Sequence, residues 1–123
     1  MAALAKLRAG PTAPTAVLCS NDMTAIGVMR QSHEDKISIP RDLSVVGFDD
    51  IRLAQFVLPP LTSVRMSQAE LARLAFHALL SDVQRQTPAP NGTEYALQTS
   101  LVLRESTAMA PGLPVRAERK NTY

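Results

Sequence analysis

The sequence contains little that could support covalent or aromatic chemistry. It has one cysteine, Cys19, and no tryptophan, and aromatic residues make up 4% of its 123 residues. A single cysteine excludes a disulfide within the chain and fits a reducing compartment, so we expect a cytoplasmic protein. With so few aromatic side chains, a core must be built from Leu, Val, Ile, Ala and Met. No apolar run approaches the length that spans a membrane.

Neither positive nor negative charge predominates over most of the chain. The net charge is +2, and the segment 116–123, with three basic residues and one acidic residue, accounts for it. A nucleic-acid interface would need basic residues clustered on a folded face. The body of the chain therefore predicts no direct contact with DNA.

Motifs of catalysis and metal binding are missing as well. His33 and His77 have no Cys, Asp or Glu partners at metal-ligand spacing. No glycine-rich phosphate loop or nucleophile elbow occurs. Cys19 falls in a run that reads as a buried strand, where a thiol packs more often than it reacts. We expect no enzyme, no metal and no cofactor.

The hydrophobic pattern does predict alternating strands and helices. Apolar runs favour buried strands at 15–20 and 42–48, a third strand after the Pro-Pro turn within 58–65, and an alternating strand at 95–105. Residues 109–123 carry Pro, Gly and charges and are predicted to be a disordered tail after a domain at 1–108. The fourth strand should place these residues on one face: Leu97, Thr99, Leu101 and Leu103.

Two helices are expected between these strands, at 22–35 and 67–86. Asp22 is placed to cap the first helix, and Ser67 and Glu70 form a capping-box pattern at the start of the second. The second helix should turn an apolar stripe toward the core. The stripe contains Leu71, Leu74, Ala75, Ala78, Leu79 and Val83.

The strand–helix–strand order of residues 15–48 predicts two parallel strands that end at one edge of the sheet. Asn21 leaves the first strand there, and Asp49 and Asp50 leave the second. Open α/β sheets bind ligands at this edge. An Asn and an Asp could hold the hydroxyls of a sugar or nucleoside, and two adjacent carboxylates could hold Mg²⁺. Alternatively, Asp50 caps the next segment and Asp49 is only solvated.

Four motifs occur along the chain in a characteristic order and spacing: "PTAVLCSNDMTAIGVMRQ", "IPRDLSVVGFDDI", "LPPLTSVR" and "SLVLREST". Together they resemble the effector-sensing domain of transcription regulators of the lactose-repressor/galactose-repressor (LacI/GalR) type, over roughly residues 1–108. The resemblance implies an α/β, type I periplasmic-binding-protein-like fold with a parallel sheet flanked by helices. It also implies that this chain is a fragment of a two-lobed domain, without the helix-turn-helix that binds operator DNA.

The resemblance assigns roles by position. Asn21 and Asp49 match residues that contact the effector, and residues 66–68 match a crossover that can touch it. Within that crossover Met66 stands where a polar Gln is common, and Gln68 is a possible second contact. Lys36 stands where many members end the helix with Gly, so it either adopts a left-handed conformation or the helix ends differently. The positions that match a homodimer interface are Ile26, Arg30, Leu53 and Val57.

Two functions follow as hypotheses. The first is the effector-sensing part of a sugar-responsive transcription regulator of the repressor type, whose effector is a sugar or nucleoside-like molecule. The alternative is a fragment of a periplasmic sugar-binding protein of a transporter. A phosphoacceptor receiver built on Asp49 and Asp50 would need another Asp and a Lys at further strand ends, and no suitable pair follows. We expect no membrane contact.

Overall fold

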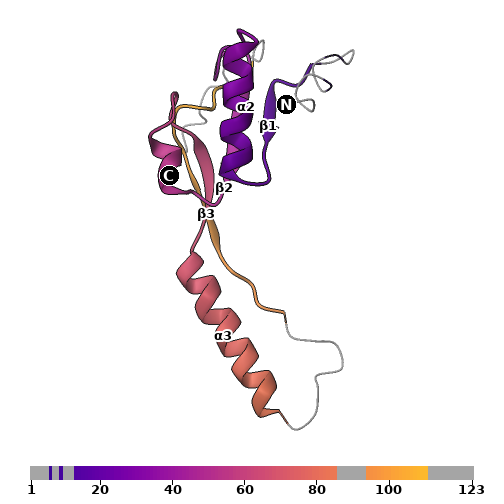
Figure 1. The fold of residues 1–123 in the computed structure, drawn as a ribbon, viewed down its shortest axis with the longest axis vertical. Coiled ribbons are helices and arrows are strands. Elements are labelled where there is room, and N and C mark those ends of the chain that lie inside the picture. Colours follow the sequence, from indigo (N-terminus) through magenta and orange to yellow (C-terminus); the bar gives the residue numbers. More distant parts are fainter. Residues whose placement is uncertain (1–5, 7–8, 10–12, 86–93, 111–123) are drawn as a thin grey trace, which may run out of the picture.

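The computed structural model describes residues 6, 9, 13–85 and 94–110. Four strands in the order β1-β2-β3-β4 form one sheet, joined by helices (Figure 1). The elements are β1 (Ala16–Leu18), α2 (Asp22–Glu34), β2 (Ser44–Phe48), the 3₁₀ turn η1 (Arg52–Gln55), β3 (Thr62–Met66), α3 (Gln68–Gln84) and β4 (Thr99–Val102). The predicted α/β class is confirmed, and each predicted element in these ranges is present. From residue 111 onward, the predicted disordered tail lies outside the described residues.

The sheet is mixed rather than wholly parallel. β1 and β3 both pair with β2 in parallel, with Val17 opposite Val45 and Gly47 opposite Ser63. β4 pairs with β3 in the antiparallel direction. The prediction of a parallel sheet is thus right for three strands and wrong for the fourth. β3 leads directly into α3, which extends away from the sheet instead of packing across it as a parallel connection would require (Figure 1).

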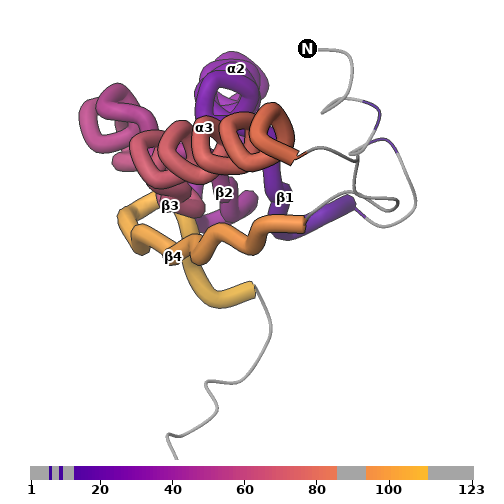
Figure 2. Tube along the Cα trace, turned by 90° about the horizontal axis from the view of Figure 1, so that it is seen from below, coloured from indigo at the N-terminus to yellow at the C-terminus, as the bar shows by residue number. Residues whose placement is uncertain are grey.

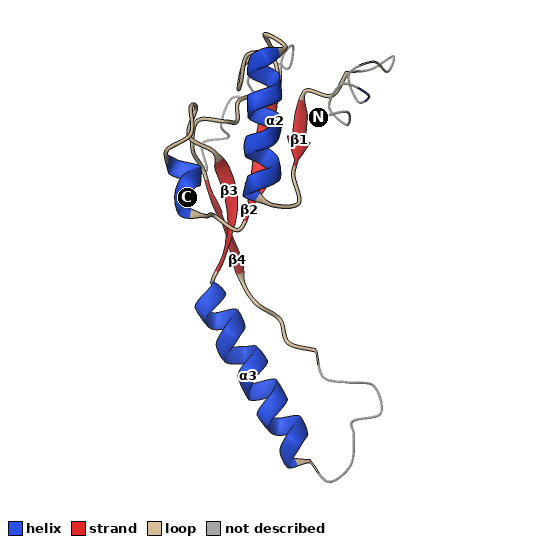
Figure 3. Cartoon of the chain, in the orientation of Figure 1, coloured by secondary structure: helices blue, strands red, loops and turns tan. Residues whose placement is uncertain are grey.

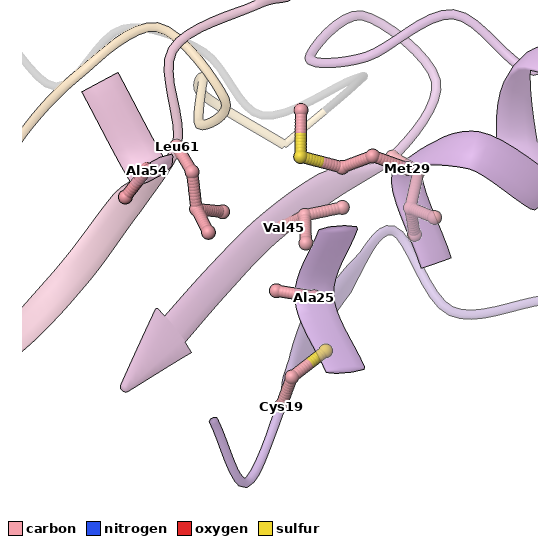
Figure 4. Packing of buried hydrophobic residues seen from close by; sticks show 7 residues of the cluster. Cys19, Ala25, Met29, Val45, Ala54 and Leu61 are labelled. Carbon is pink, nitrogen blue, oxygen red and sulfur yellow. The ribbon is translucent and has the colours of Figure 1, made fainter. Parts of the chain in front are cut away.

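A small apolar core lies between α2 and the sheet. α2 lies on one side of the strands (Figure 2), and its buried Ala25 and Met29 meet Val45 of β2 (Figure 4). Ala54 and Leu61 extend the core toward β3. The core thus consists of aliphatic and sulfur-containing side chains, as the lack of aromatics required. It contains Cys19, Ala25, Met29, Leu43, Val45, Ala54 and Leu61.

Cys19 belongs to this core, as predicted. Its thiol is free and buried, and burial raises its pKa. A thiol held in the protonated form is a poor nucleophile. β1 itself is less buried than expected, since Leu18 is 73% exposed. Among the described strands β1 pairs only with β2, so it lies at the edge of the sheet.

α3 departs most from the predicted packing. Its bounds and its start are as expected, because Ser67 accepts a hydrogen bond from the Glu70 N–H at 3.2 Å. Its apolar stripe does not face a core, however, since none of its residues is buried and Val83 is 74% exposed. The helix extends away from the sheet (Figure 3), so its stripe is not packed into the core. Among the described residues, no helix has both the length and the apolar composition needed to cross a membrane.

Candidate ligand-binding site

A hollow opens where β2 and β3 end. Because these strands are parallel, the residues that follow them meet at one edge of the sheet. Asp49 follows β2, and Met66 and Gln68 lie at the junction of β3 and α3. The three side chains line a hollow of about 540 Å³. The remaining lining residues are Asp50, Ile51, Arg52, Arg65, Ser67 and Ala69.

Asn21 is the predicted ligand residue that does not line this hollow. It is instead the N-cap of α2, and its Oδ1 accepts a hydrogen bond from the Thr24 N–H at 2.8 Å. The sequence had assigned that cap to Asp22, and this assignment is wrong. Asn and Asp cap helices about equally well, so the capping preference could not separate the two neighbours. A ligand contact by Asn21 stays a prediction.

Asp22 turns inward instead. It is fully buried, and its Oδ1 accepts a hydrogen bond from Ser63 Oγ at 2.5 Å. Its Oδ2 accepts the Ile51 N–H at 2.7 Å. A Cβ atom on Gly47 would collide with Asp22 Oδ1, so the glycine makes room for the carboxylate. That glycine, inside a strand, is the sequence signal that could have revealed the close approach.

The backbone between β2 and η1 has an uncommon conformation. Asp49 and Asp50 have φ angles of 104° and 49°, a region that non-glycine residues seldom adopt. Hydrogen bonds hold three successive N–H groups there. The Asp49 N–H donates to Val64 O at 2.9 Å, the Asp50 N–H to Ser63 Oγ at 3.1 Å, and the Ile51 N–H to Asp22. The loop is therefore fixed at each of its residues.

Asp50 is held by two arginines. Its Oδ2 lies 2.6 Å from Arg65 Nε and its Oδ1 lies 2.6 Å from Arg104 Nη2, and its side chain is only 6% exposed. Burial by itself would raise the pKa of Asp50. The hydrogen bonds and charges of Arg104 and Arg65 outweigh burial, so the pKa lies below its usual value. Asp50 is thus a structural anion.

This arrangement bears on the alternatives for the aspartate pair. Asp50 does not cap the next segment, since η1 begins at Arg52, its N-cap residue is Ile51, and no side chain caps it. A Mg²⁺ site would need Asp50, whose oxygens are taken by arginines, and no group of three His, Cys, Asp or Glu converges in the described ranges. Asp49 is half-buried, and no hydrogen bond or ion pair joins its carboxylate to another described residue. Asp49 is therefore the member of the pair available to a ligand.

The chemistry of the hollow suits a polyhydroxylated molecule. The Asp49 carboxylate can accept hydrogen bonds from hydroxyl groups, and the Gln68 amide can both donate and accept. Met66 offers a soft apolar surface beside them. Such a mixture matches a sugar, which has hydroxyl groups around an apolar ring face.

The positions predicted for a dimer interface lie on α2 and around η1. Ile26 and Val57 are half-buried against the core, and Leu53 is exposed. Arg30 is exposed and pairs with Glu34 at 3.2 Å. Further apolar side chains are exposed on the same elements and the loop after them: Met23, Phe56 and Leu58. An interface here stays a prediction.

The end of α2 and the two histidines are the remaining features that the sequence singled out. Lys36 has a φ angle of 59°, so α2 ends with a left-handed lysine where glycine would be easier. The Ile37 N–H reaches back to Ser32 O at 2.8 Å and closes the helix end. His33 and His77 are exposed, on α2 and α3.

Comparison with known proteins gives consistent matches. The family model of the periplasmic binding protein-like domain matches residues 1–107. The chain is 44% identical over 98 residues to the HTH-type transcriptional regulator MalR of Streptomyces coelicolor, covering 80% of this chain and 28% of MalR. It is 40% identical over 93 residues to the ribose operon repressor of Haemophilus influenzae, covering 76% of this chain and 27% of that protein.

A solved structure agrees with these sequence matches. A LacI family transcriptional regulator from Lactobacillus casei with bound sucrose superimposes with a TM-score of 0.61 and 35% identity, covering 77% of this chain and 34% of that one. The chain therefore spans about a third or less of the length of these relatives.

Proposed function

The chain belongs to the periplasmic binding protein-like domain family in its LacI-type form, and we propose that it is the effector-binding part of a sugar-responsive transcription regulator. The observation that carries the proposal is the hollow at the ends of β2 and β3. There Asp49 presents a carboxylate with no partner among the described residues, beside Gln68 and Met66. Asn21, at the start of α2, is proposed as a further contact.

The relatives support the regulatory class. The similar proteins are named as transcription regulators, one of them as a ribose operon repressor, and a similar solved structure holds sucrose. We propose a neutral sugar as the effector and repression as the mode of action. A regulator of this kind acts in the cytoplasm, binds operator DNA through a helix-turn-helix outside this chain, and performs no catalysis.

The transporter alternative shares the fold, but the relatives reported above are regulators. We propose further that the regulator is a homodimer and that its interface includes Ile26, Arg30, Leu53 and Val57. These residues lie on α2, on η1 and just after η1, and none of the four lines the hollow.

The experiment uses the complete natural protein. Its binding to DNA from its own promoter is measured by fluorescence anisotropy, alone and with sucrose, glucose, cellobiose, maltose or ribose. We expect at least one sugar to change DNA affinity by about fivefold or more, as a coupling of about 1 kcal/mol requires. No binding to that DNA, or binding that no sugar changes while the same sugars bind the protein, would contradict the regulatory proposal.

A further inference from the structure

We infer that Ser63 and Asp22 are positioning residues of the proposed effector site, because they hold the backbone that carries Asp49. This inference rests on the proposed function for its purpose, although the positioning itself can be tested without a sugar. Neither residue lines the hollow. Both act on the hollow indirectly, through hydrogen bonds to the loop between β2 and η1.

Ser63 is the centre of a hydrogen-bond network that joins Ser63, Asp22 and the N–H groups of Asp50 and Ile51. It is fully buried on β3, and its hydroxyl donates to Asp22 Oδ1 while accepting the Asp50 N–H. The other oxygen of Asp22 accepts the Ile51 N–H. One serine and one aspartate thus satisfy two successive backbone donors next to Asp49. Three segments meet at this point: the start of α2, the middle of β3 and the end of β2.

The network stabilises a conformation that the loop would not favour alone. Positive φ angles at Asp49 and Asp50 cost free energy for residues with a Cβ atom. Loss of the Ser63 hydroxyl would leave the Asp50 N–H and one oxygen of Asp22 without these partners. The loop could then relax toward negative φ, which would turn the Asp49 carboxylate away from its place in the hollow.

The chain offers a matched control in Ser106. This serine is also fully buried, and its hydroxyl also makes two hydrogen bonds, donating to Val45 O at 2.6 Å and accepting the Thr62 N–H at 2.8 Å. These partners lie on β2 and at the first residue of β3, and neither of them belongs to the loop of residues 49–51. Loss of either hydroxyl should therefore cost similar stability, and only Ser63 should affect Asp49.

The experiment compares Ser63→Ala with Ser106→Ala in the complete natural protein. Hydrogen–deuterium exchange is followed in peptides that cover 49–51, and affinity is measured by calorimetry for the sugar among sucrose, glucose, cellobiose, maltose and ribose that binds the unchanged protein best. We expect Ser63→Ala to speed exchange at 49–51 and to weaken sugar binding, each by about tenfold. Ser106→Ala should change both by less than about twofold, while exposing the Thr62 amide.

The outcomes separate the two proposals. Equal exchange at 49–51 in the two variants would overturn the positioning role, with or without a sugar. Faster exchange with unchanged sugar affinity would overturn the link between the network and binding. If no sugar binds the unchanged protein, the proposed function fails, and the exchange result still decides the positioning role.

Asp22→Asn serves as a second variant if Ser63→Ala does not fold. It keeps the size of the side chain and one acceptor oxygen, and it replaces the oxygen that faces Ser63 or Ile51 with a donor. We expect the same direction of change in exchange and affinity. Values equal to those of Ser106→Ala would contradict the inference.

Discussion

Asp49 and Asp50 are adjacent in the chain but have different surroundings. Asp50 is neutralised by Arg65 and Arg104, whereas Asp49 lines the hollow and forms no ion pair with another described residue. Two unpaired carboxylates on adjacent residues would repel each other, and little solvent screens them at the end of a buried strand. Pairing one of them leaves the other as a single, oriented acceptor. Asp50 therefore serves the structure, and we propose Asp49 as the ligand contact.

Removal of Arg104 should be costly, because its side chain is 17% exposed and meets a carboxylate that is 6% exposed. It also donates to Leu61 O at 2.7 Å. We predict that Arg104→Ala lowers the free energy of unfolding of the complete natural protein by about 3 kcal/mol, because the buried Asp50 carboxylate loses the more buried of its two arginine partners. Chemical denaturation measures this change.

Arg73 provides the comparison. Its ion pair with Glu70 lies on the exposed surface of α3, so Arg73→Ala should cost less than about 0.5 kcal/mol. Equal losses for the two arginine variants would mean that the Asp50 pair contributes no more than a surface pair.

The lowered pKa of Asp50 makes a prediction about acid. A carboxyl group whose pKa is lower in the folded state binds fewer protons there than in the unfolded state. Its contribution to stability is complete above its ordinary pKa, about 3.9, and is lost as the pH falls through the lower folded value. Unfolding free energies measured from about pH 7 to about pH 3 should fall more steeply below about pH 4 for the natural protein than for Asp50→Asn. Parallel curves would contradict the ion pairs.

At the scale of the elements, α2 and η1 present the proposed dimer face. In a twofold interface each side chain occurs twice, so a charge reversal acts twice. We predict that Arg30→Glu weakens dimerisation of the complete natural protein by about tenfold or more, measured by analytical ultracentrifugation. Arg73→Glu, on α3, is the control and should leave the dimer unchanged. The same dimer at the same concentrations for Arg30→Glu would place the interface elsewhere.

The sequence predicted the elements better than their packing. The Ser67 cap and the apolar spacing after it located α3 within two residues at each end. Periodicity shows that a helix has an apolar face, but it does not show what covers that face, and Leu79 and Val83 lie exposed. The antiparallel direction of β4 depends on the path of the chain around α3, which no local pattern records.

One part of the site was predictable from the strand order, and another part depends on contacts between residues far apart in the chain. The parallel strands brought Asp49, Met66 and Gln68 to one hollow, as topology required. The sequence could not show that Asn21 caps α2 while Asp22 is buried, because Asn and Asp have similar capping preferences. This arrangement depends on Ile51 and Ser63, which lie 29 and 41 residues further along the chain from Asp22.

At the scale of the whole molecule, several large apolar side chains are exposed to solvent. Leu101 and Leu103 at and after β4 are exposed, as are Leu71, Leu79 and Val83 of the α3 stripe. The two-lobed sensor that the resemblance implies would supply a second lobe to cover this face. We predict that the 123-residue chain on its own self-associates in sedimentation experiments.

A pair of variants tests which surface causes that association. Val83→Glu places a charge within the apolar stripe, and Ser81→Glu places one elsewhere on the same helix, where the side chain is also exposed. Val83→Glu should shift the chain toward smaller species, and Ser81→Glu should not. If both variants, or neither, reduce association, the α3 stripe is not the cause.

The central claim is that Asp49 binds the effector, and calorimetry of a single substitution tests it most directly. The complete natural protein, Asp49→Asn and the exposed control Asp82→Asn are titrated with the same sugar. We predict that Asp49→Asn weakens binding by about 1–3 kcal/mol, the range for loss of a charged hydrogen bond, and that Asp82→Asn binds as the natural protein does. Unchanged affinity in a folded Asp49→Asn protein would remove Asp49 from the site and contradict the account.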